Sequence, residues 1–275
     1  MILDCVPFFR ESDILELRLR ELDPVVDLFV VVEADHTHAG TEKPSYLPAD
    51  IRRRWGHKLI AYTAELPGDK PGDLLWTWRR EIAQRNAIAD VLGSLRLQPD
   101  DMVMISDCDE IPRRAFVGML PALPPDGVAV AVQRLHYYTF NHVGGWWHGT
   151  RATQWANVQA LGADGVRYAA TTRGGFPRIF HVPDAGWHFS YFGGPEYVRE
   201  KIGAFLHQEF NLPEHRDPET IAARIAAGDD VYGRSEQSFT IGAADDLPEA
   251  VQADPARWAA HFWPGYEPEM TNGNR

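Results

Sequence analysis

Cysteine is scarce in this chain of 275 residues, which contains only Cys5 and Cys108. Two thiols so far apart do not make the framework of a disulfide-stabilised secreted domain. Long apolar runs are also missing, because no stretch reaches the roughly 20 residues that a membrane-spanning helix needs. The amino terminus lacks the basic region and the cleavage site of a secretory signal. These absences predict a cytoplasmic protein with reduced cysteines and no transmembrane segment.

Basic residues are outnumbered, with 27 Lys and Arg against 39 Asp and Glu, for a formal net charge of −12. Such a charge argues against nucleic acid or an anionic membrane as the main partner. It does not exclude an anionic nucleotide, because a few basic residues or a metal ion reverse the field within one cleft. The hydrophobic share of 44% and the length suit one large globular domain.

The first 112 residues alternate short apolar runs with amphipathic segments. Strands are predicted at 2–6, 28–32, 58–63 and 102–106, and helices at 14–22 and 74–92. This order predicts an α/β fold with a mostly parallel sheet flanked by helices. A further strand is predicted at 128–135, helices at 195–210 and 218–227, and residues 136–192 are rich in aromatic side chains. We expect a single domain over 1–275, with a nucleotide-binding half (1–112) and an acceptor-side half (113–275).

The most informative motif follows the apolar run 102–105, which ends in Asp107, Asp109 and Glu110. Carboxylates at the carboxyl end of a buried strand lie in the crevice where open α/β sheets bind ligands. Asp107 and Asp109 are two residues apart, so an extended segment directs both to one side. Two close carboxylates favour a divalent cation between them, Mn²⁺ or Mg²⁺. We assign Asp109 as the direct metal ligand and Asp107 to the ribose or to a metal-bound water. The alternative is a solvated acidic turn.

Two further segments are candidates for nucleotide binding. Glu33 ends a strand and opens a polar loop that contains Lys43, at the sheet edge where the acidic motif is expected. His36 and His38 in this loop have metal-ligand spacing, although loop histidines are more often solvated. On the predicted helix, Asn86 lies close to the apolar stripe.

The same helix carries several arginines. Arg79 is predicted to reach the nucleotide or the acidic motif together with Asn86. Arg80 and Arg85 are instead interpreted as solvated charges paired with Glu81 or Asp90.

Residues 186–194 alternate aromatic and polar side chains, which is typical of a strand with one aromatic face. Trp187 and Tyr191 are candidates for stacking on an acceptor sugar. Trp146, Trp147 and Trp155 suit the same role. His188 is a candidate third metal ligand opposite Asp109, with a core histidine as the equal alternative.

These motifs together resemble glycosyltransferase family 17, the β-1,4-mannosyl-glycoprotein N-acetylglucosaminyltransferase family. The matching features are residues 20–34, Gly40, Lys43-Pro44, 79–86, 105–112 and 186–191. The resemblance implies a GT-A fold, a nucleotide-sugar donor and inversion at the anomeric carbon, with UDP-N-acetylglucosamine as the first donor to test. Because the chain shows no anchor or secretory signal, we expect a surface polysaccharide, a lipid-linked sugar or a small glycoside as acceptor rather than a Golgi N-glycan.

An inverting transferase needs one general base near the acceptor hydroxyl. Glu236 and Asp184 are the candidates. Cationic partners of the departing diphosphate are sought among Arg79, Lys43 and Arg178.

Two other functions remain open. A strand followed by Asp-X-Asp also begins the pattern of haloacid-dehalogenase-like phosphohydrolases, with Asp107 as nucleophile. That pattern prefers the motif on a first strand and Thr or Val where this chain has Ile111. A non-catalytic sugar-binding protein would explain the aromatic residues but not an intact acidic motif.

Overall fold

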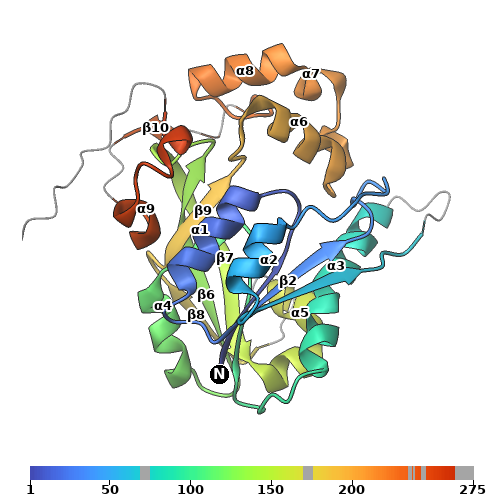
Figure 1. The fold of residues 1–275 in the computed structure, drawn as a ribbon, viewed down its shortest axis with the longest axis vertical. Helices are drawn as coiled ribbons and strands as arrows, with labels where there is room; N and C mark the ends of the chain where they lie inside the picture. Colours follow the sequence, from blue (N-terminus) through green and yellow to red (C-terminus); the bar gives the residue numbers. More distant parts are fainter. Residues whose placement is uncertain (69–74, 170–175, 235–236, 238, 243–245, 264–275) are drawn as a thin grey trace, which may run out of the picture.

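The computed structural model describes residues 1–68, 75–169, 176–234, 237, 239–242 and 246–263 (Figure 1). Their central element is a sheet in the order β3-β2-β1-β4-β7-β6-β9-β5, with β8 paired to β6 and β10 to β7. The strands are β1 (Ile2–Pro7), β2 (Leu28–Ala34), β3 (Leu59–Ala64), β4 (Met102–Ile105), β5 (Glu110–Pro112), β6 (Gly127–Tyr137), β7 (His142–Gln154), β8 (Arg178–Val182), β9 (Gly186–Ser190) and β10 (Thr240–Ile241).

The sheet is mostly parallel, as predicted. The pairs β1–β2, β1–β4, β2–β3, β6–β8 and β6–β9 are parallel. The long strand β7 is antiparallel to both β4 and β6, and β5 is antiparallel to β9. The predicted class, an α/β fold with a helix-flanked sheet and an aromatic-rich region, is confirmed.

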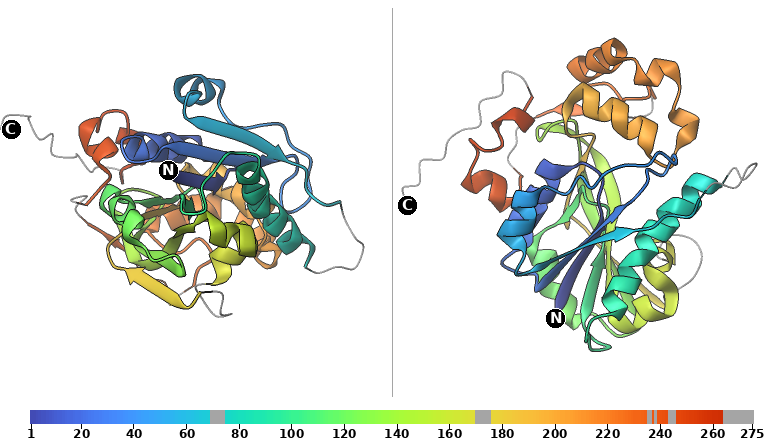
Figure 2. Two further views of the ribbon diagram at one scale, coloured as in Figure 1. Left: turned by 90° about the horizontal axis from the view of Figure 1, so that it is seen from below. Right: turned by 45° about the vertical axis from the view of Figure 1, so that its right-hand side comes forward.

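Helices cover both faces of the sheet (Figure 2). They are α1 (Ser12–Leu22), α2 (Ala49–Trp55), α3 (Trp76–Gly93), α4 (Arg114–Met119), α5 (Trp155–Ala169), α6 (Gly194–Ala204), α7 (Pro213–Arg216), α8 (Pro218–Ala227) and α9 (Glu249–Ala253). One apolar cluster joins the sheet to α1, α2 and α4, and a second joins it to α3 and α5. Successive side chains of a strand point to opposite faces of the sheet, so Val6 packs in the first cluster and Cys5 in the second. Both cysteines are buried and free, as predicted.

The segment Gly194–Ala227, here called the helical cap, lies over the edge of the sheet at the top of Figure 1. It has its own apolar cluster, which includes Val198, Ile202 and Ile221. Gly193 precedes the cap with φ at 135°, and a Cβ there would approach the Tyr197 ring to 2.7 Å. Glycine is therefore required where the chain turns from β9 into the cap.

The sequence predicted the strands and long helices of the first half but not α2, α5 or β7. The predicted helix 195–210 is also shorter, because α6 ends at Ala204. No helix in the described ranges combines the length and the apolar character that crossing a bilayer requires.

His136 of β6 is a buried histidine that the fold keeps neutral. Its side chain is 3% exposed, and its Nδ1 donates to the carbonyl oxygen of Phe140 at 2.6 Å. Burial lowers the pKa of His136 from 6.5 to about 4. Between these values the unfolded chain takes up a proton that the folded protein resists, so stability falls as the pH falls. At pH 5 this one group costs about 2 kcal/mol relative to pH 7.5.

Replacing His136 with asparagine keeps a donor near the position of Nδ1 but removes the titrating ring. We expect the difference in unfolding free energy between pH 7.5 and pH 5 to shrink by about 2 kcal/mol. Urea denaturation of both proteins at the two pH values measures this difference. An unchanged difference would show that His136 does not resist protonation in the folded state.

Candidate functional site

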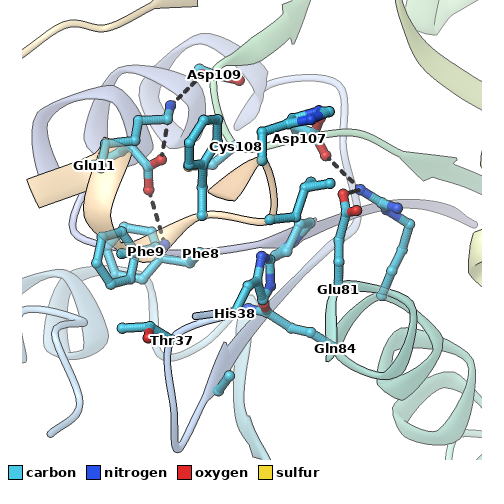
Figure 3. Close-up of a pocket in the computed structure, with 18 of the residues that line it drawn as sticks. Phe8, Phe9, Glu11, Thr37, His38, Glu81, Gln84, Asp107, Cys108 and Asp109 are labelled. Atoms are coloured by element: carbon cyan, nitrogen blue, oxygen red, sulfur yellow. Dashed lines mark hydrogen bonds and ion pairs between the residues drawn. The ribbon is translucent and has the colours of Figure 1, made fainter. Parts of the chain in front are cut away.

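A cavity of about 610 Å³ lies at the carboxyl ends of β1, β2 and β4. Figure 3 shows the side chains of its floor. Its lining includes Phe8, Phe9, Glu11, His36, His38, Lys43, Trp78, Glu81, Gln84, Arg85, Asp107, Cys108, Asp109, Trp147, His148, Arg151, Arg167, Tyr168, His188, Ser190, Tyr191, Lys201, Phe205 and His207. The acidic motif and the Glu33 loop therefore meet at one edge of the sheet, as the parallel strands predicted.

Arg18 of α1 fixes the backbone of the acid loop, defined as Asp107–Glu110. Its guanidinium is fully buried and binds both carboxylate oxygens of Asp4 on β1, at 2.5 and 2.6 Å. The remaining nitrogen donates to the carbonyl oxygen of Glu110 at 2.6 Å. Because all three guanidinium nitrogens of Arg18 are hydrogen-bonded, its side chain is fixed and holds the acid loop in place.

Asp107 is held by two arginines from different helices. Its Oδ1 lies 3.2 Å from Nη2 of Arg85 on α3, and its Oδ2 lies 3.0 Å from Nη2 of Arg167 on α5. Burial opposes ionisation of this carboxyl group, but Arg167 and Arg85 outweigh it and lower the pKa of Asp107. The side chain is 38% exposed, so the ionised carboxylate faces the cavity.

Glu110 lies below Asp107 and is fully buried. Its carboxylate accepts from both Nη atoms of Arg167, at 2.5 and 2.7 Å, and from the indole N–H of Trp147 at 2.6 Å. The backbone N–H of Asp107 also donates to it, at 3.1 Å. Glu110 therefore orients Arg167 and Trp147, which line the cavity, and does not line the cavity itself.

Asp109 points to the other side of the loop, toward the helical cap. Its Oδ2 lies 3.1 Å from Nζ of Lys201, and its Oδ1 lies 3.5 Å from Nε2 of His188. The pairing of β5 with β9 sets Glu110 opposite His188, which brings the imidazole beside Asp109. Burial opposes ionisation, but Lys201 and His188 outweigh it and lower the pKa of Asp109 well below its usual range.

The predicted metal ligands are brought together only in part. Asp109 and His188 are close enough to share one ion, and Nδ1 of His188 is buried without a hydrogen-bond partner among the described residues. Asp107 is instead directed to Arg85 and Arg167. In the described part of the chain no three His, Cys, Asp or Glu side chains converge on a metal position. The residues fit a Mn²⁺ or Mg²⁺ ion held by two protein groups, with substrate phosphates and water as the other ligands.

The exposure predicted for Arg79, Arg80 and Arg85 of α3 is reversed, although the predicted pairing of Arg85 with Glu81 is present at 2.6 Å. Arg80 and Arg85 were expected to be solvated, but both are buried. Arg80 donates to the carbonyl oxygens of Pro67 and His38, and Arg85 binds Asp107. Arg79 has an exposed side chain and does not line the cavity. The helix is therefore rotated relative to the predicted orientation.

Asn86 joins α3 to α5. Its Oδ1 accepts from the backbone N–H of Asp164 at 3.0 Å, where α5 is interrupted at Gly162 with φ at 74°. A Cβ at Gly162 would approach Oδ1 of Asn86 to 2.8 Å. Asn86 thus supports the part of α5 that presents Arg167 and does not line the cavity.

The Glu33 loop is built around a buried ion pair. Glu33 accepts from the backbone N–H of Tyr46 at 2.7 Å and from the hydroxyl of Ser45, and it lies 3.5 Å from Nζ of Lys43. Lys43 lines the cavity, whereas Glu33 lies behind it. In the same loop, His38 is bound to Oε1 of Gln84 at 2.7 Å, and burial lowers its pKa.

The predicted acceptor and base residues lie in different places. Tyr191 lines the cavity, and its hydroxyl meets that of Tyr232 at 2.6 Å. Trp187 is 2% exposed and packs in the core on the other face of β9. Asp184 forms an ion pair with Arg113 outside the cavity. Glu236 lies outside the described residues.

The other aromatic and basic candidates are also separated. Trp147 lines the cavity, whereas Trp155 belongs to the core. Trp146 is 53% exposed and lies under the guanidinium of Arg134. Arg178 pairs with Asp126 at the surface, away from the cavity.

Sequence reasoning missed Glu11, Arg18, Arg167 and Lys201. Arg18 carried a signal, because a charged residue stands among the leucines of the apolar face of α1. Arg167 is 57 residues away from its partner Glu110, and Lys201 is 92 residues away from its partner Asp109. A local sequence pattern therefore could not have predicted either contact.

The sequence model of glycosyltransferase family 17 matches residues 1–252. The chain belongs to this family. It is 31% identical over 258 residues to the beta-1,4-mannosyl-glycoprotein 4-beta-N-acetylglucosaminyltransferase of Mus musculus, which covers 82% of this chain and 47% of the mouse protein. The protein of the same name from Rattus norvegicus is 32% identical over 120 residues, which are 41% of this chain and 22% of the rat protein. The chain therefore spans about half the length of the mouse relative, or less.

Solved structures are more distant from this family 17 chain. The crystal structure of a mycobacterial protein is similar with a TM-score of 0.39 and 12% identity, over 74% of each chain. The inositol-1-phosphate CTP transferase from T. maritima gives a TM-score of 0.36 and 10% identity, over 69% of this chain and 89% of that chain.

Three segments that resemble family 17 in sequence converge at the cavity. The loop after β2 contributes Lys43, the acid loop contributes Asp107 and Asp109, and β9 contributes His188. The helix α3 contributes Arg85 in place of the predicted Arg79. These segments all lie within residues 1–252, the range that the family model matches.

Proposed function

We propose that this family 17 member transfers a sugar from a UDP-sugar to a glycan or glycoside acceptor, with inversion and with the help of Mn²⁺ or Mg²⁺. N-acetylglucosamine is the first candidate sugar, because it is the group in the name of the mammalian relatives. The observation that carries the proposal is the acid loop, which presents ionised Asp107 and Asp109 to a large cavity among basic side chains.

The charges around the cavity suit a nucleoside diphosphate. The chain as a whole carries a net charge of −12, yet Arg85, Arg151, Arg167 and Lys201 all line this one space. Burial lowers the pKa of Arg151 to about 10, which leaves it protonated at neutral pH. Fixed cations stabilise the negative charge that develops on a departing diphosphate without reorganising during the reaction.

Asp109 and His188 would hold the metal ion, which supplies further positive charge to the donor phosphates when bound. The protein groups do the positioning. Arg85 and Arg167 fix Asp107 at the cavity wall by binding one oxygen each, and the second lone pair of either oxygen can accept a hydrogen bond from a ribose hydroxyl. Trp147 is fixed by its bond to Glu110 and offers an exposed ring for a sugar. Glu236 stays the proposed base.

The same geometry disfavours a phosphohydrolase. A nucleophilic Asp107 would need a free carboxylate oxygen, but both of its oxygens are bound by guanidinium groups at 3.0 and 3.2 Å. An ionised carboxylate paired in this way is a weak nucleophile.

A donor panel tests the proposal. We expect release of UDP from UDP-N-acetylglucosamine or another UDP-sugar in the presence of mixed glycoside acceptors, suppression by EDTA and recovery with Mn²⁺. GDP-, CDP- and dTDP-sugars serve as controls. Turnover of another donor class alone, or hydrolysis of an aryl phosphate without any sugar transfer, would overturn it.

A further inference from the structure

Lys201 leaves the polar face of α6 and enters the cavity. Its side chain is 18% exposed, against 39% for Arg199 and 62% for Glu196 on the same helix. The neighbouring Val198 and Ile202 are fully buried in the cluster of the helical cap. Lys201 is therefore a cation that the cap delivers to the acid loop, not a surface charge.

Two carboxylates, those of Glu11 and Asp109, hold the ammonium and are labelled in Figure 3. Nζ lies 3.1 Å from Oδ2 of Asp109 and 3.4 Å from Oε1 of Glu11. Glu11 is itself fixed, because its other oxygen accepts from the backbone N–H of Phe9 at 2.9 Å. The rings of Tyr191 and Tyr197 lie 5.5 and 5.8 Å from Nζ. Two carboxylates and two aromatic rings thus fix the position of the ammonium beside the acid loop.

The cap that carries Lys201 is attached across the cavity as well as through β9. The backbone N–H of Ala39, in the loop after β2, donates to the carbonyl oxygen of Ala204 at 3.1 Å. The rings of Trp78 on α3 and His207 after α6 meet edge to face at 5.2 Å. These contacts fasten the end of α6 to the loop after β2 and to α3. They therefore hold Lys201 over the cavity.

Two other cations of the cavity, Arg85 and Arg167, are more fully paired than Lys201. Arg85 is bound by Glu81, Asp107 and Asp164, and Arg167 forms paired bonds with Glu110. Lys201 instead makes two ion pairs, at 3.1 and 3.4 Å, at the end of a flexible stem, and a lysine binds phosphate as a point charge. An arriving metal ion would compete for Asp109 and free the ammonium for an anionic oxygen.

We propose that Lys201 binds the diphosphate of the nucleotide-sugar donor, which makes the helical cap part of the donor site. This inference rests on the proposed function for the identity of the donor. The ligand chemistry that it names is a diphosphate, whichever nucleoside carries it. Asp109 and Glu11 then serve to keep the ammonium in the cavity while the donor is absent.

The test compares Lys201→Gln with Lys58→Gln. The amide of glutamine can still donate to Asp109 and Glu11, so it removes the charge with little loss of local contacts. Lys58 is a matched control, because its side chain is also 18% exposed and its Nζ lies 3.1 Å from Oδ1 of Asp23, away from the cavity. Isothermal titration calorimetry with UDP, uridine and inorganic pyrophosphate, each with Mn²⁺, supplies the readout.

We expect Lys201→Gln to weaken UDP and pyrophosphate binding about 10- to 100-fold, as loss of a charge-assisted contact does, and to leave uridine binding unchanged. Lys58→Gln should bind all three like the wild type, and Lys201→Arg should recover most of the UDP affinity. Unchanged UDP binding, or an equal loss for UDP and uridine, would overturn the role. Pyrophosphate binding that depends on Lys201 without any UDP binding would support Lys201 and refute the UDP-sugar donor. Wild-type protein that binds neither UDP nor pyrophosphate would overturn both.

Discussion

Replacing Arg18 with methionine is expected to lower the free energy of unfolding by about 3–5 kcal/mol, the largest stability effect we predict. Arg18 and Asp4 form a buried pair with side chains 0% and 1% exposed. The variant leaves the carboxylate of Asp4 buried without its cation, and it removes the donor that fixes the carbonyl oxygen of Glu110. For a chain of this size the melting temperature should fall by roughly 6–20 °C.

The double variant Asp4→Asn/Arg18→Met should be more stable than the sum of the two single changes predicts, because it leaves no unpaired charge. Arg20→Met is the matched control on the same helix. Its side chain is 37% exposed, and its partner Glu16 keeps Arg54 and Arg257 when Arg20 is lost, so we expect a change within about 1 kcal/mol. Thermal and urea unfolding of the wild type, the two single variants Asp4→Asn and Arg18→Met, the double variant and Arg20→Met measures these effects. Equal losses for Arg18→Met and Arg20→Met would contradict the anchoring role.

Replacing Asp109 with asparagine is expected to reduce sugar transfer at least about 100-fold, the largest activity effect we predict. The amide keeps the shape of the side chain but loses the charge that faces Lys201, His188 and the proposed metal ion. The initial rate of UDP release, with donor and acceptor varied separately, gives kcat and both KM values. We expect the loss to fall on kcat and on the KM for the donor, with the KM for the acceptor little changed.

Asp126→Asn is the matched control for this change. Asp126 is 43% exposed and pairs with Arg178 on the surface, outside the cavity. Its variant should transfer sugar at the wild-type rate. If Asp109→Asn kept more than half of the wild-type rate, the acid loop would not be the catalytic centre.

Much of the fold could be predicted because its signals are local. The apolar runs that become β1, β2 and β4 are buried on both faces, as inner strands of a parallel sheet must be, whereas the edge strand β3 is partly exposed. The position of the acidic motif followed from the same pattern, because it comes directly after β4. The pairing of β5 with β9, which the sequence did not reveal, is what places His188 beside Asp109.

The orientation of α3 could not be predicted in the same way. Its arginines are distributed around the helix, so charge alone does not reveal which ones face the sheet. Arg85 is buried because Glu81, Asp107 and Asp164 surround it, and two of these partners come from other elements. Tertiary pairing of this kind overrides the ordinary preference of arginine for solvent.

The contribution of the helical cap to the site could not be predicted from the sequence for a related reason. Lys201 belongs to a helix whose other charged residues are exposed, and only the packing of the cap directs it inward. The predicted base Asp184 shows the opposite error, because a residue expected in the site lies outside it. Asp184 precedes β9, whereas the residues of β9 that line the cavity, His188 and Ser190, lie toward its other end, so Asp184 meets Arg113 instead of a substrate.

Calorimetric titration of the wild-type protein with UDP, with and without Mn²⁺, tests the central claim most directly. We expect UDP to bind more tightly with Mn²⁺, and this metal-dependent gain to disappear in Asp109→Asn. GDP and CDP should bind more weakly under the same conditions. No binding of UDP with Mn²⁺ present, or equal binding in the Asp109→Asn variant, would contradict a metal-assisted UDP-sugar site at the acid loop.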